Sequence, residues 1–259
     1  AFTNTSSFFY DVNSLYNGYN TYGSPFRQFV ADESIKNIHG ANIINSVNLN
    51  NSITVRGGSD FANINYDQGQ VYFTSPVSNP DTTLSGDFAV KDFNTYITND
   101  LEEKLLFETQ FTVRNKTDLT ATGLPPSTMT YPAIFIKNNG SRNEPLAFGG
   151  TDKTETDIRA IVLSDDQYKI DAVGSIFRDR ARTIVPVIPE TGMPFNTLGD
   201  FRDNVQYNYT GLSSQFPDSG VFIDNVYTSK IGGVTYTQKT NINPDVFSMI
   251  IDFEVSDIR

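Results

Sequence analysis

The stretch that most constrains the fold of this chain is TDIRAIVLSDDQYKIDAVGSIFRDRARTIVP, residues 156–186, where a complete strand pattern runs directly into a complete helix pattern. In its first part, Ile158, Ala160 and Val162 recur at every second position and fall on one face of a strand. A strand needs neighbours for its backbone groups, and an amphipathic helix needs an apolar surface to cover. The stretch therefore predicts a sheet that carries a helix on one face.

The helix is expected at about residues 165–183. Ser164 and Gln167 have the spacing of a capping box, and the two aspartates between them lie where the helix dipole favours anions. Apolar residues then recur at three- and four-residue steps until Pro186 ends the pattern. These residues are Ile170, Val173, Ile176, Phe177 and Ile184. They predict an apolar stripe that packs on the sheet.

Three further strands are expected in the second half of the chain. PAIFIK, residues 132–137, is a short apolar strand, and NNGSRNEPLAFGG, residues 138–150, has the composition of a loop. VFIDNVYT, residues 221–228, and VFSMIIDFEVS, residues 246–256, are the last two strands, and the final one has an apolar residue at every odd position. The expected fold class is α+β and β-rich: an antiparallel sheet with one main covering helix, plus a small N-terminal β module.

Residues 1–35 are interpreted as an aromatic N-terminal arm. Glycines and Pro25 interrupt this segment, so its rings cannot bury one another and must pack on the body of the protein or on a neighbouring subunit. The sequence leaves both possibilities open. The candidate contact residues of the arm are Phe8, Phe9, Tyr10, Tyr16, Tyr19 and Tyr22.

Residues 36–95 are interpreted as a small β module. SITVR, residues 52–56, alternates, and NINYDQGQVYF, residues 63–73, places turn residues between two apolar pairs, which predicts a hairpin. The third expected segment, residues 96–259, holds the α+β core. It begins with a helical turn that leads into a strand, followed by the loop TDLTATGLPPSTMTYP, residues 117–132.

A long irregular stretch, residues 186–220, interrupts the expected core. Loops of this length are usually functional or disordered. The aromatic content of this one favours function, because aromatic anchors commonly carry most of the binding energy of an interface. The candidate contact residues are Phe195, Phe201, Tyr207 and Tyr209.

Composition argues against several classes of function. A formal net charge of −11 argues against a surface that neutralises phosphates, since nucleic-acid affinity comes mainly from clustered lysine and arginine. The absence of cysteine excludes disulfides and thiolate metal ligands. His39 is the only histidine, and no G-x-S-x-G motif accompanies it, so a turn residue explains it better than a general base. We expect no catalytic residue, no metal and no cofactor.

The sequence shows neither a secretory signal pattern nor a membrane-spanning pattern. The first residues, AFTNTSSFFY, lack a basic segment followed by an apolar one, and no apolar run is long enough to span a bilayer. Secretion and membrane insertion are therefore both disfavoured, and synthesis in the cytosol is expected.

The order of elements over roughly residues 131–259 resembles the tail-terminator or tail-completion proteins of tailed bacteriophages. The segments DIRAIVL, DDQYKIDAVGSIFRDRARTI, VFIDNVYT and VFSMIIDFEVS carry this resemblance. In that family a small antiparallel sheet carries a helix on one face, and the chain closes with an alternating strand. A neck protein between portal and tail would have the same appearance.

The resemblance implies a virion structural protein without enzymatic activity, placed in the tail or neck and assembled in the host cytoplasm. It implies self-association into rings, commonly hexameric, with tail-tube and connector proteins as further partners and DNA passing through the lumen without specific binding. The sheet face that the helix leaves uncovered would then meet a neighbour or the lumen. Asp252 and Glu254 are the candidates for an acidic lumen that repels DNA phosphates.

Two other classes of function remain open from the sequence alone. A carbohydrate-binding or adhesin-like β protein would stack sugars on tyrosine, because the chain has no tryptophan. A hydrolase would need two placed carboxylates, and the acidic residues of this chain do not single out a pair.

Overall fold

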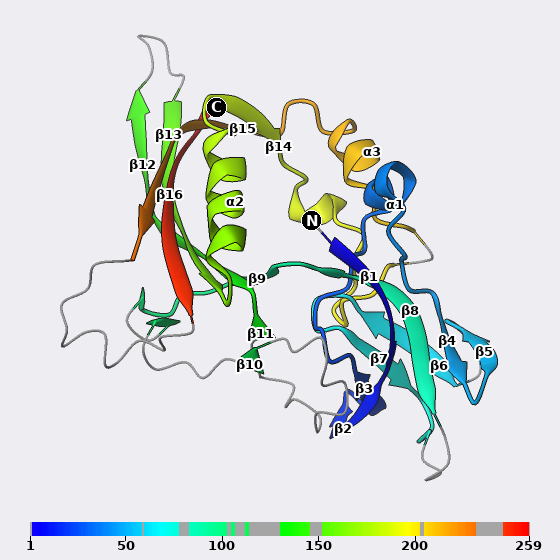
Figure 1. The fold of residues 1–259 in the computed structure, drawn as a ribbon. Coiled ribbons are helices and arrows are strands. Elements are labelled where there is room, and N and C mark those ends of the chain that lie inside the picture. Colours follow the sequence, from blue (N-terminus) through cyan, green and yellow to red (C-terminus); the bar gives the residue numbers. More distant parts are fainter. Residues whose placement is uncertain are drawn as a thin grey trace. The chain divides into compact units, whose positions relative to one another are not determined.

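A computed structural model describes residues 2–58, 60–77, 83–102, 105–106, 112–113, 130–145, 152–202, 205–231 and 246–258 (Figure 1). Strands predominate, and the chain divides into two compact units. Unit 1 takes its residues from 1–92, 114–130 and 188–215, and unit 2 from 93–113, 131–187 and 216–259. The predicted β-rich α+β fold class is confirmed.

Unit 1 holds two four-stranded antiparallel sheets, ordered β1-β8-β4-β5 and β2-β3-β7-β6. Both sheets contribute to one apolar core, in which Phe29 packs on Phe88 with 4.7 Å between ring centroids and Phe61 stacks on Phe73 at 5.1 Å. Removal of these rings from water stabilises the unit. The elements are β1 (Phe2–Phe8), β2 (Tyr10–Tyr16), β3 (Tyr19–Gly23), α1 (Glu33–His39), β4 (Ser46–Leu49), β5 (Ser52–Val55), β6 (Phe61–Asn65), β7 (Gln70–Phe73) and β8 (Leu84–Lys91).

The segment predicted to be an N-terminal arm belongs to the sheets of unit 1. β1 pairs with β8 along its whole length, and β3 pairs with both β2 and β7. Phe9 and Tyr22 are buried in the core between these sheets. The division observed therefore differs from the one expected at residues 35 and 95, because the strands that pair with β1 and β3 lie later in the sequence.

The hairpin predicted at residues 63–73 is confirmed. β6 and β7 pair with Ile64 opposite Val71. A second hairpin joins β4 to β5 through Asn50 and Asn51, whose φ angles are 50° and 65°. Asparagine tolerates this left-handed conformation better than most residues, which explains the tight turn.

Unit 2 is built on a six-stranded sheet in the order β14-β15-β16-β13-β12-β9. Neighbouring strands are antiparallel except β12 and β9, which run parallel, so the sheet is mixed at one edge where the sequence predicted an antiparallel sheet. Two very short strands form a separate pair, β10 (Thr112–Val113) with β11 (Thr130–Tyr131). The strands of the large sheet are β9 (Asn94–Ile97), β12 (Ala133–Pro145), β13 (Asp152–Ser164), β14 (Thr183–Pro186), β15 (Gly220–Lys230) and β16 (Phe247–Ile258).

The helix α2 (Gln167–Arg178) packs on one face of this sheet, as the sequence predicts, and Figure 1 shows it beside β13 and β16. Phe177 meets Phe253 edge-on with 5.3 Å between ring centroids. At Gly174 the helix comes close to β16, because a Cβ there would lie 2.8 Å from the sulfur of Met249. The buried cluster between helix and sheet consists of Ile134, Ala160, Val162, Ile170, Val173, Met249 and Ile251.

The start of α2 differs from the predicted capping box. Its N-cap is Asp166, whose carboxylate accepts the N–H of Tyr168 at 2.8 Å. The Ser164 hydroxyl instead accepts the N–H of Asp166 at 3.2 Å. The serine therefore fixes the chain before the helix, and the aspartate next to the helix caps it.

The end of α2 also differs from the prediction, which extended the helix to residue 183. The helix stops at Arg178, and Arg182 takes a φ of 62° as the chain turns into β14. In β14, the backbone groups of residues 183–186 form ladder hydrogen bonds with β15. A further helical turn at this point would run into Pro186, which has no N–H to donate. Ile184 consequently lies on a strand and is not part of the helix stripe.

Residues 138–145, expected in a loop, continue β12 as a strand. A register shift beside Gly140, whose φ is 139°, absorbs one extra residue opposite β13. Beyond it, the hydroxyls of Ser141 and Thr156 lie 3.0 Å apart across the ladder. Composition alone misled here, because these polar side chains find partners on the neighbouring strand. Residues 146–150 of the same predicted loop lie outside the described part of the chain.

The stretch 186–220 begins inside β14, ends inside β15 and contains regular elements between them. These are a 3-10 turn η2 (Glu190–Gly192), the short helix α3 (Tyr209–Ser213) and a bridge between Phe195 and Phe201. The sequence predicted an irregular loop here, because none of these pieces is long enough to show a period.

Candidate functional site

The sheet of unit 2 has one face under α2 and an opposite face that carries most of its charged residues. Side chains alternate along a strand, so the neighbours of the buried Ala160 and Ile251 point to this opposite face, here called the charged face. One end of it is apolar, where Phe135 and Ile161 are buried and Tyr96 stacks on Phe135 at 5.3 Å. The rest carries Lys137, Arg142, Lys153, Glu155, Asp157, Arg159, Asp252 and Glu254.

Arg159 is the centre of the first charged cluster on this face. Its Nε and Nη2 lie 2.6 and 3.1 Å from the two carboxylate oxygens of Asp252, which is its register partner on β16. Its Nη1 lies 2.6 Å from Oε1 of Glu102. The hydrogen bonds to Asp252 and then to Glu102 raise the pKa of Arg159 above its ordinary value. The three side chains therefore form a fixed unit, in which one guanidinium is shared by two carboxylates.

A second charged cluster lies further along the same strands. Arg142 donates from Nε to Glu155 at 2.8 Å, and Nζ of Lys153 lies 2.7 Å from the other oxygen of Glu155. These hydrogen bonds, from Lys153 first and then Arg142, lower the pKa of the Glu155 carboxyl. An open depression of about 220 Å³ beside the cluster is lined by Gly140, Ser141, Arg142, Glu155 and Asp157.

Asp252 and Glu254, the candidates for an acidic lumen, both lie on the charged face and are half-buried. Asp252 is paired with Arg159, and Glu254 accepts the side-chain N–H of Asn225 at 2.6 Å. Arg159 thus offsets only part of the negative charge of Asp252, because it is also paired with Glu102. Sequence reasoning missed Arg159, which is 93 residues from Asp252 and becomes its neighbour only through strand register. An acidic lumen stays a prediction. The charged face carries basic as well as acidic side chains.

An exposed apolar pair borders the charged face at the outer strand. Ile184 on β14 lies directly opposite Phe222 on β15, and their side chains are 70% and 37% exposed. We call this pair the apolar edge. It continues a row across the sheet that runs through Ser256 and Glu155 to Arg142. Sequence reasoning placed Ile184 on the helix, so the pair could not be seen before the strand β14 was known.

The aromatic residues predicted as contacts at the N-terminus divide into two groups. Phe9 and Tyr22 are buried, while Tyr10 and Tyr19 are partly covered, Tyr19 by stacking on Tyr72 at 6.2 Å. Phe8 and Tyr16 are exposed. Of the two possibilities left open, packing on the protein's own body therefore accounts for the first group, and only Phe8 and Tyr16 present large exposed surfaces.

Three of the four aromatic contact candidates of the 186–220 stretch turn inward. Phe201 is buried against Tyr66 with 4.7 Å between centroids, and Phe195 packs on Tyr207 at 5.4 Å. Burial raises the pKa of the Tyr207 hydroxyl to about 12. Tyr209 opens α3, and its N–H donates to Asp32 at 3.1 Å. The rings of Phe195, Phe201 and Tyr207 pack within unit 1, so they are poor candidates for anchors on another subunit.

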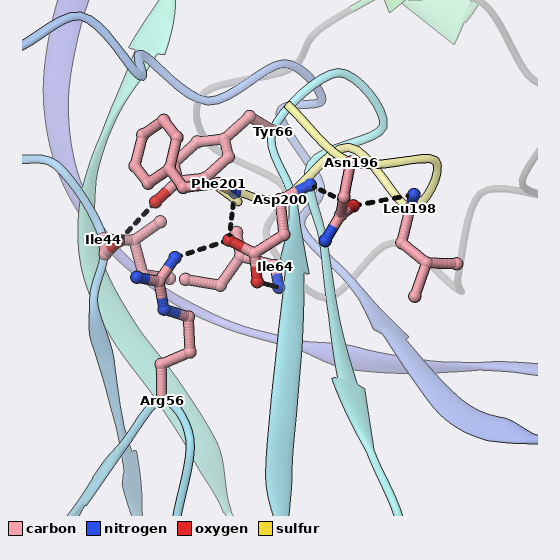
Figure 2. Close-up of polar contacts among 8 residues, drawn as sticks. All are labelled: Ile44, Arg56, Ile64, Tyr66, Asn196, Leu198, Asp200 and Phe201. Carbon is pink, nitrogen blue, oxygen red and sulfur yellow. Dashed lines mark hydrogen bonds and ion pairs between the residues drawn. The ribbon is translucent and has the colours of Figure 1, made fainter. Parts of the chain in front are cut away.

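Asp200 fastens the same stretch to unit 1, as Figure 2 shows. Its buried carboxylate lies 2.5 Å from Nη1 of Arg56 and accepts the N–H of Ile64 at 3.0 Å and of Phe201 at 2.7 Å. Asn196 accepts the N–H of Asp200 at 3.1 Å and so holds the preceding turn. The guanidinium also lies over the Phe201 ring, 5.6 Å from its centroid. This cluster fixes residues 196–201 to β6 and to Arg56.

The only histidine lies outside these clusters. His39 ends α1 and is exposed, where a basic side chain complements the helix dipole. Within the described ranges, no group of three His, Asp or Glu side chains is arranged to hold a metal ion. The side chains brought together on the charged face are ion pairs, which are suited to fixing a surface and its register.

No helix in the described part of the chain has the length and apolar character needed to cross a membrane. Comparisons of the chain with protein-family models, with curated proteins and with solved structures find no match.

Proposed function

We propose that this protein is a virion structural protein of a tailed bacteriophage, which forms a ring at the tail or neck and joins the tail tube to the head connector. In this role it acts by shape and by contacts. The arrangement of β13, α2, β15 and β16 supports the proposal, because the family that the sequence resembles has a sheet with a helix on one face and an alternating last strand.

The observation that carries the proposal is the apolar edge of unit 2. Ile184 and Phe222 lie opposite each other at the outermost strand, and exposed apolar side chains at a sheet edge are typical of a contact with another chain. The ion pair of Glu155 with Arg142 lies in the same row of the sheet, on the far side of Ser256. An apolar centre with a polar border is the usual anatomy of a protein interface.

The two edges of this sheet are unlike, which favours a ring. β14 forms one edge, and on the other β9 pairs with β12 only at residues 133–136. Residues 138–145 of β12 therefore have β13 as their only strand neighbour in the part of the chain that is described. Contact between two different edges is head-to-tail, and it closes into a ring when the rotation between subunits fits. In the proposed ring, β14 of one subunit lies beside residues 138–145 of the next.

Substitution of Ile184 by lysine is expected to convert the assembled protein into smaller species. A charge at the centre of the contact must lose its hydration, and charged side chains on edge strands oppose pairing. Size-exclusion chromatography with light scattering, on the full chain at equal concentrations, measures the molar mass. Ile38→Lys is the matched control, because Ile38 is 69% exposed on α1 in unit 1.

The proposal predicts a lower molar mass for Ile184→Lys and an unchanged mass for Ile38→Lys, with far-ultraviolet circular dichroism the same for both. An Ile184→Lys protein that assembles like the unmodified chain would remove the apolar edge from the ring contact.

A further inference from the structure

The first strand of the chain leaves an open sheet edge in unit 1. β1 is the outermost strand in the order β1-β8-β4-β5, and β8 is its only strand neighbour among the described residues (Figure 1). Edge strands are commonly protected by a charge, a proline or a bulge. The sequence of β1, FTNTSSF, contains neither a charge nor a proline, and its pairing with β8 runs without a register shift. This edge is therefore regular and unprotected.

The backbone groups of β1 can be assigned to its two sides. Phe9, which follows β1 in the same register, donates its N–H to the carbonyl of Leu84 at 2.8 Å, so this pair is hydrogen-bonded. In an antiparallel ladder, bonded and non-bonded residues alternate. The odd-numbered residues of β1 therefore point their N–H and C=O groups toward β8. Asn4, Ser6 and Phe8 point theirs away from β8, to the open edge.

The other side of β8 gives the same assignment independently. Val30 donates its N–H to the carbonyl of Ala89 at 2.8 Å, so the backbone groups of Ala89 point away from β1. Asn4 is the register partner of Ala89, and its own backbone groups therefore point away from β8. Within the described part of the chain, no hydrogen bond ends on the outward backbone groups of Asn4, Ser6 or Phe8. These donors and acceptors are available to a further strand.

The side chains at this edge are apolar near its two ends. Phe8 is 66% exposed at one end. Phe2, at the other end, is partly buried against Val30 and Ala89, where Ile35 of α1 also packs. Both phenylalanines lie on the same face of the sheet, because they are an even number of residues apart on one strand. An antiparallel copy of β1 at this edge would bring its own Phe8 beside Phe2.

The charge of the chain identifies a second copy as a suitable partner. Residues 1–10 contain no charged side chain, although the chain carries a formal net charge of −11. Copies of an acidic protein repel one another, and an uncharged edge is where two of them approach at the lowest electrostatic cost. The edge is also self-complementary, since aromatic side chains that face each other across two strands stabilise their pairing.

We propose that β1 pairs with β1 of a second copy of this chain, antiparallel and about a two-fold axis at Thr5. In this register Asn4 of each copy faces Ser6 of the other, and Phe2 faces Phe8. All four residues point their backbone groups to the open edge, so each facing pair exchanges both of its hydrogen bonds. A two-fold contact cannot close a ring by itself, so this contact is separate from the apolar edge of unit 2 and goes beyond the proposed ring.

The contact is small, and its strength follows from its size. Two paired strands of seven residues lie at the low end of interface sizes, below about 1,200 Å², where complexes are weak and transient. Association through β1 is therefore concentration-dependent. It links two free subunits, or subunits of two rings.

Ser6→Pro tests this contact with little effect on the sheet of unit 1. Proline removes the outward N–H of residue 6, while the bonds from β1 to β8 come from the odd-numbered residues. The experiment uses sedimentation velocity over a concentration series, on the full chain that also carries Ile184→Lys to weaken the proposed ring contact. We expect the association constant to fall by about tenfold or more, because each two-fold contact loses two hydrogen bonds. Ser6→Ala is the matched control, since it keeps the backbone N–H and should leave the association constant unchanged.

Phe8→Lys is a second variant, which leaves the backbone of β1 intact. It removes the exposed ring that faces Phe2 of the other copy and places a charge in the contact. The association constant should fall as it does for Ser6→Pro. The amides of Gly86 and Val90, which bond to β1, should exchange at the same rate in both variants as in their parent, because β1 stays paired with β8.

Hydrogen exchange gives a residue-level readout on the chain with intact β1. The amides of Asn4, Ser6 and Phe8 should become more protected as concentration rises. Those of Thr5 and Ser7 already bond to β8 and should not change.

Two results would overturn the proposal. One is equal association of Ser6→Pro, Phe8→Lys and their parent, and the other is a parent that stays monomeric at every concentration. Failure of the ring proposal appears separately, as assembly that Ile184→Lys does not affect.

Discussion

Replacement of Asp200 by alanine is expected to destabilise unit 1 by about 3–5 kcal/mol, the range for breaking a buried ion pair on one side. The side chains of Arg56 and Asp200 are 13% and 4% exposed, so the guanidinium would be left in the interior without its counter-ion. The N–H groups of Ile64 and Phe201 would lose their acceptor as well. Residues 194–202 should then detach from β6 before the rest of the unit unfolds.

Urea denaturation measures this loss, and hydrogen exchange locates it. Asp218→Ala is the control, because Asp218 is exposed, and it should change the free energy of unfolding by less than about 0.5 kcal/mol. A double-mutant cycle with Arg56→Ala should give a large coupling energy, since the double variant no longer buries a lone charge. A cost for Asp200→Ala as small as that of the control would show that the pair does not hold this segment.

Replacement of Ile251 by alanine is expected to destabilise unit 2 by about 2–5 kcal/mol. Ile251 is fully buried on β16, in the cluster that joins the sheet to α2. Its loss leaves a cavity under the helix, in addition to the apolar surface that is no longer buried. The effect should appear in amides of α2, β13 and β16, while unit 1, which has a core of its own, keeps its protection.

Ile176→Ala is the matched control for this substitution. Ile176 lies on α2 but is exposed, and its replacement should leave the free energy of unfolding nearly unchanged. If both variants unfold at the same denaturant concentration, the packing of α2 on the sheet would not be the source of stability for unit 2.

The parts of unit 2 that were predictable are those with a long, regular period. The alternation in residues 246–256 and the stripe containing Ile170 and Val173 each extend over several repeats, and both face the common core. The predicted helix was too long because Ile184 has the same spacing as the apolar stripe of α2. Its role in β14 depends on pairing with residues far along the chain, which no local pattern contains.

Unit 1 was less predictable for a related reason. Its first strands read as a detached arm because their partners, β7 and β8, begin at residues 70 and 84. The strand at residues 138–145 read as a loop because its polar side chains are satisfied only across the ladder. The charged face could not be predicted for the same reason. Arg159 and Asp252 are remote in sequence and become neighbours only through the strand register.

The proposed function requires this chain to fit against copies of itself through the sheet of unit 2. Negative-stain electron microscopy of the purified full chain, combined with its molar mass in solution, is the decisive measurement. We expect closed rings of one uniform size, which are lost when Ile184 is replaced by lysine. A protein that remains a single subunit at all concentrations would rule out the ring.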